Sequence, residues 1–452
     1  MSPVIDRSDL PIRLVVLNHN GGEMTLRCLQ HLHDLEWPRD RLQIVCLDND
    51  SSDGSIEQVE NEFPDVDVRR LGSNHGFPAN NEALNDLDNV RFVGLVNNDA
   101  FVEPQWLRKL VEALDSDRGV GAVCPKILLE PEFSTVALTV PLFDAGRAEP
   151  RTLGVKLRGV TVEGIDVSST TNLGDSGWGR EVDEVGTYEW TRPEAELRIP
   201  APSSAATFTA VLTIDAPQAC TSSIDSGSGS TEYQLKRGVQ SIAVEVSTPR
   251  HDVIHNVGSI VFDDGYGADR GWLQFDEGQF DTPVDVFAWC GGGVLFRPEY
   301  LEDVGLFDPA FFLYYEDTDL SWRGRARGWR YRTVPVARMR HVHSASTGEV
   351  SALTSYLTER NRLLMLVRNA PMRFVMRQVL RYPLTTASYA RRDVVHPLVQ
   401  RKRPTTVKVK RRILSYVGLL RLLPAALTER RALRSRQLVP DSEIEGWFVS
   451  HG

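Results

Sequence analysis

Residues 13–99 alternate between short apolar runs and helical patterns, and this alternation limits the possible folds more than any other feature of the chain. The apolar runs are RLVVLN (13–18), LQIVCLD (42–48), VDVRRL (66–71) and VRFVGLVNND (90–99). Runs of this kind are typical of strands buried on both faces, and strands that alternate with helices form a parallel, doubly wound sheet. The sequence therefore predicts a mostly parallel, Rossmann-like α/β domain.

Polar side chains stand at or just beyond the end of each of these strands. They are Asn18, Asp48 to Asp53, Asn74, and Asn97 to Asp99. Asn, Asp and Ser are also common in caps and turns, so one such cluster would carry little information. Ligands of doubly wound sheets bind beyond the carboxyl ends of the strands, so four clusters there predict a binding crevice. In it, Asp48 could accept hydrogen bonds from a ribose or a base edge, and Asp99 could bind Mg²⁺ or Mn²⁺.

The pattern changes twice after residue 132. Residues 133–257 contain short alternating strand patterns separated by Gly, Ser and Pro clusters, which predict an inserted all-β module of sandwich or jelly-roll type. Residues 258–370 return to the mixed pattern, and residues 371–452 predict a helical, basic C-terminal region. We therefore expect one α/β domain whose two halves, residues 1–132 and 258–370, are separated by the β module.

The composition is that of a globular protein, with 41% hydrophobic and 25% charged residues. No apolar run reaches the roughly 18 residues that a membrane span needs, and we see no secretory signal. The five cysteines are widely spaced and none forms a CxxC pair. We therefore expect free thiols in a reducing cytoplasm rather than disulfides or a thiolate zinc site.

The net charge of −10 hides an asymmetry along the chain. Residues 371–437 contain 17 of the 51 Lys and Arg residues but only 2 of the 61 Asp and Glu residues. Such a basic tail predicts an anionic partner, and the inner face of the cell membrane is one candidate. A solvated helical face or an oligomer contact is the alternative. Nucleic acid is not expected, because the tail lacks interleaved aromatic residues and the rest of the chain is acidic.

The stretch FFLYYEDTDLSWR (311–323) places Glu316 and Asp317 directly behind a run of aromatic residues. An ordinary helix start explains part of this pattern, because the helix dipole favours acids in the first turn. Asp319 and Arg323 also have the spacing of an ion pair on a helix. An acid at an apolar rim can instead have a raised pKa, which would suit a general base.

The stretch RMRHVHSAS (338–346) contains a second candidate group. His341 and His343 are two residues apart, so they would share one face of an extended segment. A neutral imidazole is a common metal ligand, although a histidine pair alone does not establish a metal site.

Taken in order, these motifs resemble those of the family-two glycosyltransferases of the GT-A fold. The matching segments are VVLNHN, CLDNDSSDGS, SNHGFPANNEAL, VGLVNNDAFVEP and WCGGGVLFRPEYLEDVGLFDPAFFLYYEDTDLSWRGRARGWRY, followed by the histidine motif. The resemblance covers about residues 13–130 and 258–370. Within this family, the chain resembles the bacterial cell-envelope branch, which includes rhamnosyl-, galactofuranosyl- and mannosyltransferases. The segment GTYEWTRPEAELRIP resembles the β-sandwich inserted in some actinobacterial members.

The resemblance implies roles for individual residues. Donor nucleotide binding would involve Asn18, Asp48, Asp50, Asn74, Gly76, Asn97 and Asn98. The divalent metal, Mn²⁺ or Mg²⁺, would be held by Asp99 and His341, with Asn97 in the place of the first acid of the metal motif. Asp317 matches the catalytic base. The acceptor pocket would be lined by Trp289, Cys290, Gly291, Gly292 and Glu316.

The implied activity is an inverting transfer from a nucleoside-diphosphate sugar to a glycan or polyprenyl-linked acceptor in cell-envelope polysaccharide synthesis. A dTDP-rhamnose-like donor is favoured, with the enzyme cytoplasmic and peripheral on the membrane. Two other functions remain open. A non-catalytic carbohydrate-binding or scaffold protein on the same fold is favoured by Asn97 and by the β module. A nucleotidyltransferase would need a basic loop after the first strand, and LNHNGGEM has no Lys or Arg.

Overall fold

The computed structural model describes residues 7–146, 149–202, 206–227, 229–342, 352–401 and 403–450. The chain divides into two compact units. The second unit consists of Leu128–His255 and Leu273–Gly278, and the rest of the chain belongs to the first. The segment predicted as an insert, residues 133–257, therefore lies mostly in the second unit, which also takes in the short return segment.

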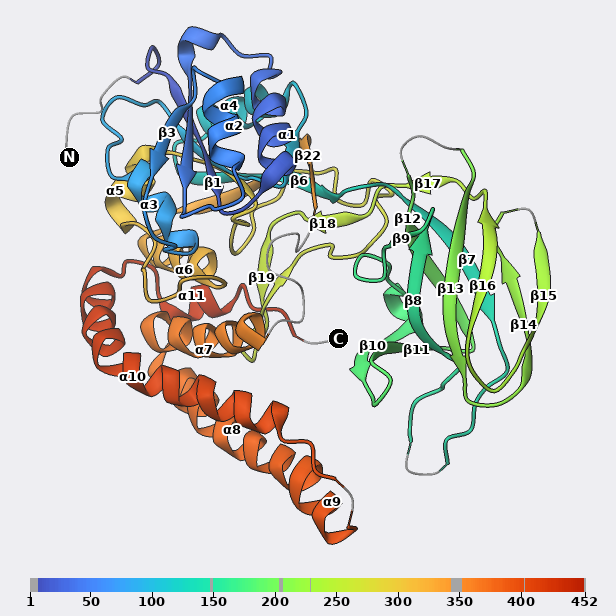
Figure 1. Ribbon diagram of the computed structural model, residues 1–452. Helices are drawn as coiled ribbons and strands as arrows, with labels where there is room; N and C mark the ends of the chain where they lie inside the picture. Colours follow the sequence, from blue (N-terminus) through green and yellow to red (C-terminus); the bar gives the residue numbers. More distant parts are fainter. Residues whose placement is uncertain are drawn as a thin grey trace. The chain divides into compact units, whose positions relative to one another are not determined.

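The first unit is built on a mixed sheet, which has nine strands among the described residues (Figure 1). Its main path runs β3-β2-β1-β4-β21-β6-β22-β5, and β18 pairs with β6. The bounds are β1 (Ile12–Asn18), β2 (Leu42–Asp48), β3 (Asp67–Arg70), β4 (Val93–Asn97), β5 (Ala100–Val102), β6 (Val120–Leu129), β18 (Ile254–Asn256), β21 (Gly293–Phe296) and β22 (Arg330–His341). Strands β1 to β4 pair in parallel, whereas β21 and β22 pair antiparallel with β4 and β5.

Helices cover both faces of this sheet. They are α1 (Gly22–His33), α2 (Ser55–Glu62), α3 (Asn81–Leu84), α4 (Trp106–Ser116), α5 (Pro298–Val304) and α6 (Glu316–Arg327). Successive residues of β1 point into different cores. Leu14 shares a cluster with residues of α1, α2 and α4, whereas Val15 packs with residues of α3, α5 and α6. Burial on both faces explains why these strands are apolar along most of their length.

The predicted fold class is confirmed. The chain contains a mostly parallel α/β sheet, additional antiparallel β-sheets and C-terminal helices. One difference concerns the fourth predicted strand, residues 90–99. The structure ends β4 at Asn97 and starts the separate strand β5 at Ala100, because the chain turns at Asn98 and Asp99 to reach the far edge of the sheet.

The second unit contains two antiparallel sheets. One has the order β10-β11-β8-β13-β16 with β9 beside β8, and the other β12-β7-β14-β15 with β17 beside β7. The bounds are β7 (Phe133–Thr139), β8 (Lys156–Val162), β9 (Ile165–Asp166), β10 (Gly177–Val182), β11 (Thr187–Thr191), β12 (Glu194–Pro200), β13 (Phe208–Ala216), β14 (Cys220–Asp225), β15 (Ser230–Leu235), β16 (Gly238–Val246) and β17 (Arg250–His251). Leu212 of β13 and Leu197 of β12 are fully buried in one hydrophobic cluster, so the sheets face each other as a sandwich.

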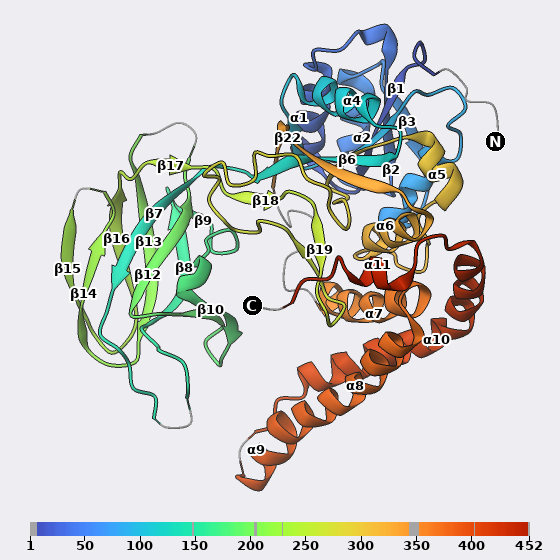
Figure 2. The same cartoon turned by 180° about the vertical axis from the view of Figure 1, so that it is seen from behind.

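Among the described residues, helices follow the sheet at the C-terminal end of the first unit (Figure 2). They are α7 (Ala352–Asn369), α8 (Met372–Ala390), α9 (His396–Val399), α10 (Val407–Arg436) and α11 (Asp441–Glu445). Leu363 of α7 and Leu419 of α10 share a core with Phe311 and with Trp322 of α6. Within the described residues, none of the helices combines the length and the apolar character needed to cross a membrane. A small hairpin, β19 (Ser259–Val261) and β20 (Gly267–Asp269), also belongs to this unit.

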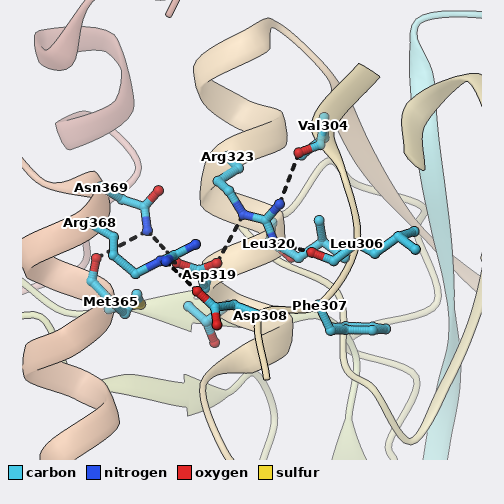
Figure 3. Close-up of polar contacts among 12 residues, drawn as sticks. Val304, Leu306, Phe307, Asp308, Asp319, Leu320, Arg323, Met365, Arg368 and Asn369 are labelled. Carbon is cyan, nitrogen blue, oxygen red and sulfur yellow. Dashed lines mark hydrogen bonds and ion pairs between the residues drawn. The ribbon is translucent and has the colours of Figure 1, made fainter. Parts of the chain in front are cut away.

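A buried ionic network attaches α6 to α7 (Figure 3). The carboxylate of Asp319 is fully buried and accepts hydrogen bonds from Arg323 at 2.9 Å, Arg368 at 2.9 Å and Asn369 at 2.7 Å. Burial alone would raise the pKa of Asp319, but the charges of Arg368 and Arg323 outweigh burial and hold it below its ordinary value. The predicted ion pair of Asp319 with Arg323 is confirmed, and the second arginine ties the helix to the C-terminal region.

We predict that Asp319→Ala lowers the free energy of unfolding of the first unit by about 3–5 kcal/mol, because the buried guanidinium of Arg323 loses its counter-charge and that of Arg368 keeps only Asp308. Denaturant unfolding followed by circular dichroism measures this loss. The control is Asp67→Ala, which removes an exposed partner of Arg69 and should cost less than about 1 kcal/mol. Equal losses in the two variants would contradict the role of the network.

Candidate active site

The carboxyl ends of three strands meet at one edge of the sheet. The parallel register sets Asn18 of β1 opposite Asp48 of β2, and Leu17 opposite Asn97 of β4. The polar residues predicted from separate stretches of sequence are therefore neighbours in the fold.

Asn18 and Asn98 hold this edge together from within. The fully buried amide of Asn18 donates to Ser51 at 3.1 Å and to Ser55 at 2.9 Å. Its oxygen accepts hydrogen bonds from Thr25 at 2.7 Å and from Asn98 at 3.3 Å. Because these contacts use both ends of the Asn18 amide, the side chain orders the strand-end turns rather than projecting towards a ligand.

Asp48 and Asp50 differ in exposure. Asp48 is 5% exposed and accepts a hydrogen bond from the backbone of Ser51 at 3.1 Å. Asp50 is exposed and has a left-handed backbone with φ of 70°. The turn after β2 thus holds one near-buried carboxylate and one exposed carboxylate.

Asn49, which the sequence analysis did not single out, attaches this turn to the loop at residues 74–76. Its amide donates to Asn74 Oδ1 at 3.0 Å and to the carbonyl of Gly76 at 3.2 Å, and its oxygen accepts from the backbone of His75 at 2.8 Å. Asn74 in turn accepts from the backbone of Gly76 at 2.9 Å. Its position between two predicted residues in DNDSSDGS was the only signal that could have indicated it.

The backbone at Gly76 lies against the segment that precedes α6. Gly76 has φ of 66°, and a Cβ atom there would stand 2.0 Å from the carbonyl oxygen of Phe312. The next residue, Phe77, donates its backbone N–H to that same oxygen at 2.7 Å. Only glycine suits this close approach, which joins the loop at residues 74–76 to the stretch that carries the predicted base.

Asp99 and His341 meet across 242 residues of sequence because β5 and β22 pair. The antiparallel register sets His341 opposite Ala100, and the carboxylate of Asp99 lies 2.9 Å from His341 Nε2. The amide nitrogen of Asn97 is 3.2 Å from the same Nε2. Asp99 and His341 are each 6% exposed. His343 and the Ser-Ala-Ser sequence after it lie outside the described residues.

This cluster fits a hard divalent cation that receives further ligands from a substrate. The described residues contain no group of three or more His, Cys, Asp or Glu side chains arranged for a metal, so Asp99 and His341 form a two-ligand set. Mg²⁺ and Mn²⁺ are often held by one or two protein groups together with phosphate oxygens. Asn97 can turn its amide oxygen to the same point as a neutral third group.

The loop from Trp289 to Gly292 connects this cluster to the predicted base. The carbonyl of Gly292 accepts from the backbone of Asn97 at 3.2 Å, and the backbone of Gly291 donates to Asp317 Oδ2 at 3.3 Å. Cys290, between them, is partly buried. Trp289 differs from the expectation of a pocket-lining residue. Its ring is fully buried and packs against Phe296, so it supports the loop from the core side.

The residues before α6 are held in an unfavourable backbone conformation. Phe312, Tyr314 and Tyr315 have φ of 64°, 69° and 69°, in the left-handed region. Each such residue costs of order 1–3 kcal/mol unless its surroundings compensate. The buried amide of Asn361 on α7 supplies compensation, donating at 2.8 Å to the carbonyls of Phe311, Leu313 and Tyr314.

Glu316 is buried and Asp317 is partly buried at the start of α6, and their environments differ. Asp317 accepts hydrogen bonds from the backbone of Thr318 at 2.6 Å, from its hydroxyl at 3.1 Å, and from Gly291. Burial raises the pKa of Asp317, and these hydrogen bonds oppose the rise. Among the described residues, Oε2 of Glu316 has no partner. Burial and then the charge of Asp317 raise the pKa of Glu316 well above its ordinary value.

Asp269 is a further carboxyl group beside this site that the sequence analysis missed. It ends β20 and accepts a hydrogen bond from the fully buried Asn256 at 2.5 Å. Burial raises its pKa to about 6, with the hydrogen bond from Asn256 opposing the rise and the charge of Asp317 adding to it. The residue occurs in GYGADRG, which has no motif that would have indicated a carboxylate near Asp317.

Comparison with known proteins gives one family match. Residues 14–154 match the model of the family described as Glycosyl transferase family 2. This segment contains the ends of β1, β2 and β4 together with Asp99. No curated protein matches the sequence. Residues 14–154 are therefore a glycosyl transferase family 2 segment.

Several solved structures also match the chain. GalNAc-T7 with UDP, GalNAc and Mn²⁺ aligns with a TM-score of 0.44 and 14% identity over 79% of this chain and 48% of that chain, about half of its length. Mannosyltransferase PcManGT from Pyrobaculum calidifontis, in complex with GDP-Man and Mn²⁺, aligns with a TM-score of 0.37 and 12% identity over 97% and 79%. S. aureus TarS 1-349 aligns with a TM-score of 0.41 and 10% identity over 96% and 89%.

We predict that Asn361→Leu accelerates amide hydrogen exchange in residues 311–317 by about tenfold or more, because the carbonyls of Leu313 and Tyr314 lose the side-chain donor that holds them and that of Phe311 loses one of its donors. Hydrogen exchange with mass spectrometry measures the change. The control is Gln378→Leu on α8, which removes another buried amide whose Nε2 has no partner among the described residues. Unchanged exchange in the Asn361 variant would contradict its role as the support of this loop.

Proposed function

We propose that this chain, with its glycosyl transferase family 2 segment, is an inverting glycosyltransferase that transfers a sugar from a nucleoside-diphosphate donor to a hydroxyl group of an acceptor. The observation that carries the proposal is the run of contacts from Asp99 and His341 through Asn97, Gly292 and Gly291 to Asp317. These contacts connect the two residues proposed to hold the cation to the proposed base through the adjacent residues Gly291 and Gly292. Sugar transfer requires the group that binds the donor diphosphate and the base that acts on the acceptor hydroxyl to lie near each other.

The donor nucleotide is proposed to lie over the ends of β1, β2 and β4. Asp48 is the buried carboxylate available to ribose or base hydrogen-bond donors, and Asp50 stands at the rim. The loop at residues 74–76, fixed by Asn49, borders the same edge. Asn18 and Asn98 would position these turns for the nucleotide rather than contact it, because their amides bind protein groups.

Asp317 is the proposed base. It takes the proton of the acceptor hydroxyl as that oxygen attacks the anomeric carbon on the face opposite the leaving diphosphate. The new glycosidic bond forms as the bond to the diphosphate breaks, so one displacement inverts the configuration. The three hydrogen bonds to Asp317 stabilise its carboxylate and oppose the rise in pKa that burial causes. Burial raises the pKa of Glu316 well above its ordinary value, and in its protonated form Glu316 can donate a hydrogen bond to the acceptor.

Asp99 and His341 would hold Mn²⁺ or Mg²⁺. A cation bound there would neutralise charge on the departing nucleoside diphosphate. The protein supplies the near-buried carboxylate and imidazole in a fixed register, and the substrate oxygens complete the ligand set. Asn97, in the place of a second acid, lowers the negative charge of the site and so its affinity for the free cation.

The sequence resemblance to cell-envelope enzymes supports a narrower proposal. The donor would be dTDP-rhamnose or a similar deoxysugar nucleotide, and the acceptor a glycan or a polyprenyl-linked sugar used in envelope polysaccharide. The β-sandwich unit would bind acceptor glycan. A lipid-linked acceptor would bring the enzyme to the inner face of the cell membrane.

A second function has a specific observation in its favour. Asn97 replaces an acid of the metal motif, and the chain carries a separate β-sandwich. A carbohydrate-binding or scaffold protein on this fold would show both features. It would have no need of a buried, strained loop presenting Asp317, so we favour the enzyme. Glycan binding without turnover of any donor would reverse this preference.

We predict that Asp317→Asn lowers kcat/KM by about 10²–10⁴, because the amide cannot accept the proton. A donor screen with Mn²⁺ or Mg²⁺ identifies the substrate, and transfer or donor hydrolysis is then measured for both proteins. The matched control is Glu316→Gln, which copies a neutral side chain at the adjacent buried position and should change kcat/KM by less than about tenfold. Full turnover by Asp317→Asn, or a larger loss in Glu316→Gln, would refute the assignment.

We predict that Asp99→Asn and His341→Gln each weaken Mn²⁺ binding about tenfold or more in the presence of nucleoside diphosphate, because each removes one of two protein ligands. Electron paramagnetic resonance of Mn²⁺ measures binding independently of turnover. Asp53→Asn, which alters an exposed turn on the same sheet edge, serves as the control. Mn²⁺ binding equal to wild type in both site variants would remove these residues from the metal site.

A further inference from the structure

The end of the helical hairpin formed by α8, α9 and α10 exposes large apolar side chains. Helices α8 and α10 run side by side, and α9 lies at the end remote from the sheet (Figures 1 and 2). The exposed side chains there are Leu384 (72%), Val395 (53%), Leu398 (56%), Val399 (77%) and Val407 (70%). We call these five residues the hairpin tip. Scattered apolar residues are normal at protein surfaces, whereas such a local group marks a contact surface.

The apolar surface continues along α8 as a regular stripe. Met372, Met376, Leu380 and Leu384 recur every four residues, and all are exposed. Phe374, Val375, Gln378 and Tyr382 form the buried face of the same helix. The exposed stripe is therefore in addition to the apolar side that packs into the protein, and packing within the chain does not explain it.

Basic residues accompany the exposed stripe and the tip. Arg373, Arg377 and Arg381 each follow one stripe residue and are exposed. Arg391, Arg392 and Arg401 are exposed beside the tip. Asp393 is the only acidic residue between Arg381 and Lys410 in the sequence, and it already pairs with Arg392. The tip thus combines apolar side chains with a strong excess of positive charge.

We propose that the hairpin tip docks on an anionic lipid bilayer, with its five apolar side chains in the boundary between headgroups and acyl chains. Arg391 and Arg401 then contact lipid phosphates. Helices that lie on membranes combine apolar and basic faces in this way. The inference names the surface and the mode of contact. It rests on the proposed function only for the lipid-linked acceptor, and its test does not require turnover.

Charge selects this partner over two others. A second copy of the chain would bring two sets of arginines together in a symmetric contact, which costs binding energy through like-charge repulsion. Single-stranded nucleic acid would call for aromatic platforms, and the tip residues are aliphatic. An anionic bilayer accommodates both the aliphatic side chains and the arginines.

The test measures binding of the full chain to vesicles of phosphatidylcholine, with and without phosphatidylglycerol, by flotation at low and high salt. The tip variant carries Leu384→Ser, Leu398→Ser, Val399→Ser and Val407→Ser, all at exposed positions. The matched control carries Ile165→Ser, Val182→Ser and Val185→Ser, which are 69%, 73% and 69% exposed in the β-sandwich unit. A charge variant carries Arg391→Gln and Arg401→Gln.

Wild type and control should bind phosphatidylglycerol vesicles equally, and the tip variant roughly tenfold or more weakly. The charge variant should lose most of the dependence on phosphatidylglycerol and on salt. Absence of wild-type binding at low salt, or equal binding by the tip variant, would overturn the proposal. So would a wild-type dimer in sedimentation velocity that the tip variant converts to a monomer without any change in lipid binding.

Discussion

The strained stretch from Phe312 to Tyr315 is the constraint on which the arrangement of the site depends. Three non-glycine residues there adopt left-handed backbone conformations, and their cost must be met by contacts elsewhere. One contact comes from the loop at Gly76 and Phe77. The backbone N–H of Phe77 donates to the carbonyl of Phe312, and Gly76 leaves room for that carbonyl. Another comes from α7, where Asn361 contacts three carbonyls. The stretch is therefore held both by the loop at Gly76 and Phe77 and by α7. These contacts fix the position of Glu316 and Asp317, which follow it directly.

The C-terminal helices consequently belong to the site as supports, although none of their residues lies at the sheet edge. Helix α7 carries Asn361 and, about two turns later, Arg368 and Asn369, which bind the buried carboxylate of Asp319 on α6. Helix α7 thus holds both the residues just before α6 and Asp319 in its first turn. Residues of α6, α7, α8 and α10 share one hydrophobic core, so the helices that carry the proposed membrane contact pack in the same core as α6.

The sequence predicted the sheet and most of the residues at its edge, because strand burial and polar strand ends are local patterns. It also predicted that Asp99 and His341 act together, but only through resemblance, since no local pattern encodes the β5–β22 register that joins them. The resemblance also implied that Trp289 lines the acceptor pocket, and the structure places its fully buried ring against Phe296. Asn361 and Asp269 escaped notice because their importance arises from long-range contacts that leave no periodicity in the sequence.

The hydrogen bonds around the two acids decide which of them ionises. Glutamate has the higher ordinary pKa of the two, and burial raises the pKa of both Glu316 and Asp317, so burial alone does not select the base. Asp317 receives two hydrogen bonds from Thr318 and one from Gly291, which stabilise its anion, whereas Oε2 of Glu316 has no partner among the described residues. These hydrogen bonds favour the anion of Asp317, and its charge adds to burial in raising the pKa of Glu316. Burial still moves the pKa of Asp317 above its ordinary value, so the proposed base would be lost by protonation as pH falls through that raised pKa. Gly291 belongs to the loop that also contacts Asn97. The position of that loop therefore affects both the basicity of Asp317 and its distance from Asp99 and His341, the proposed ligands of the cation.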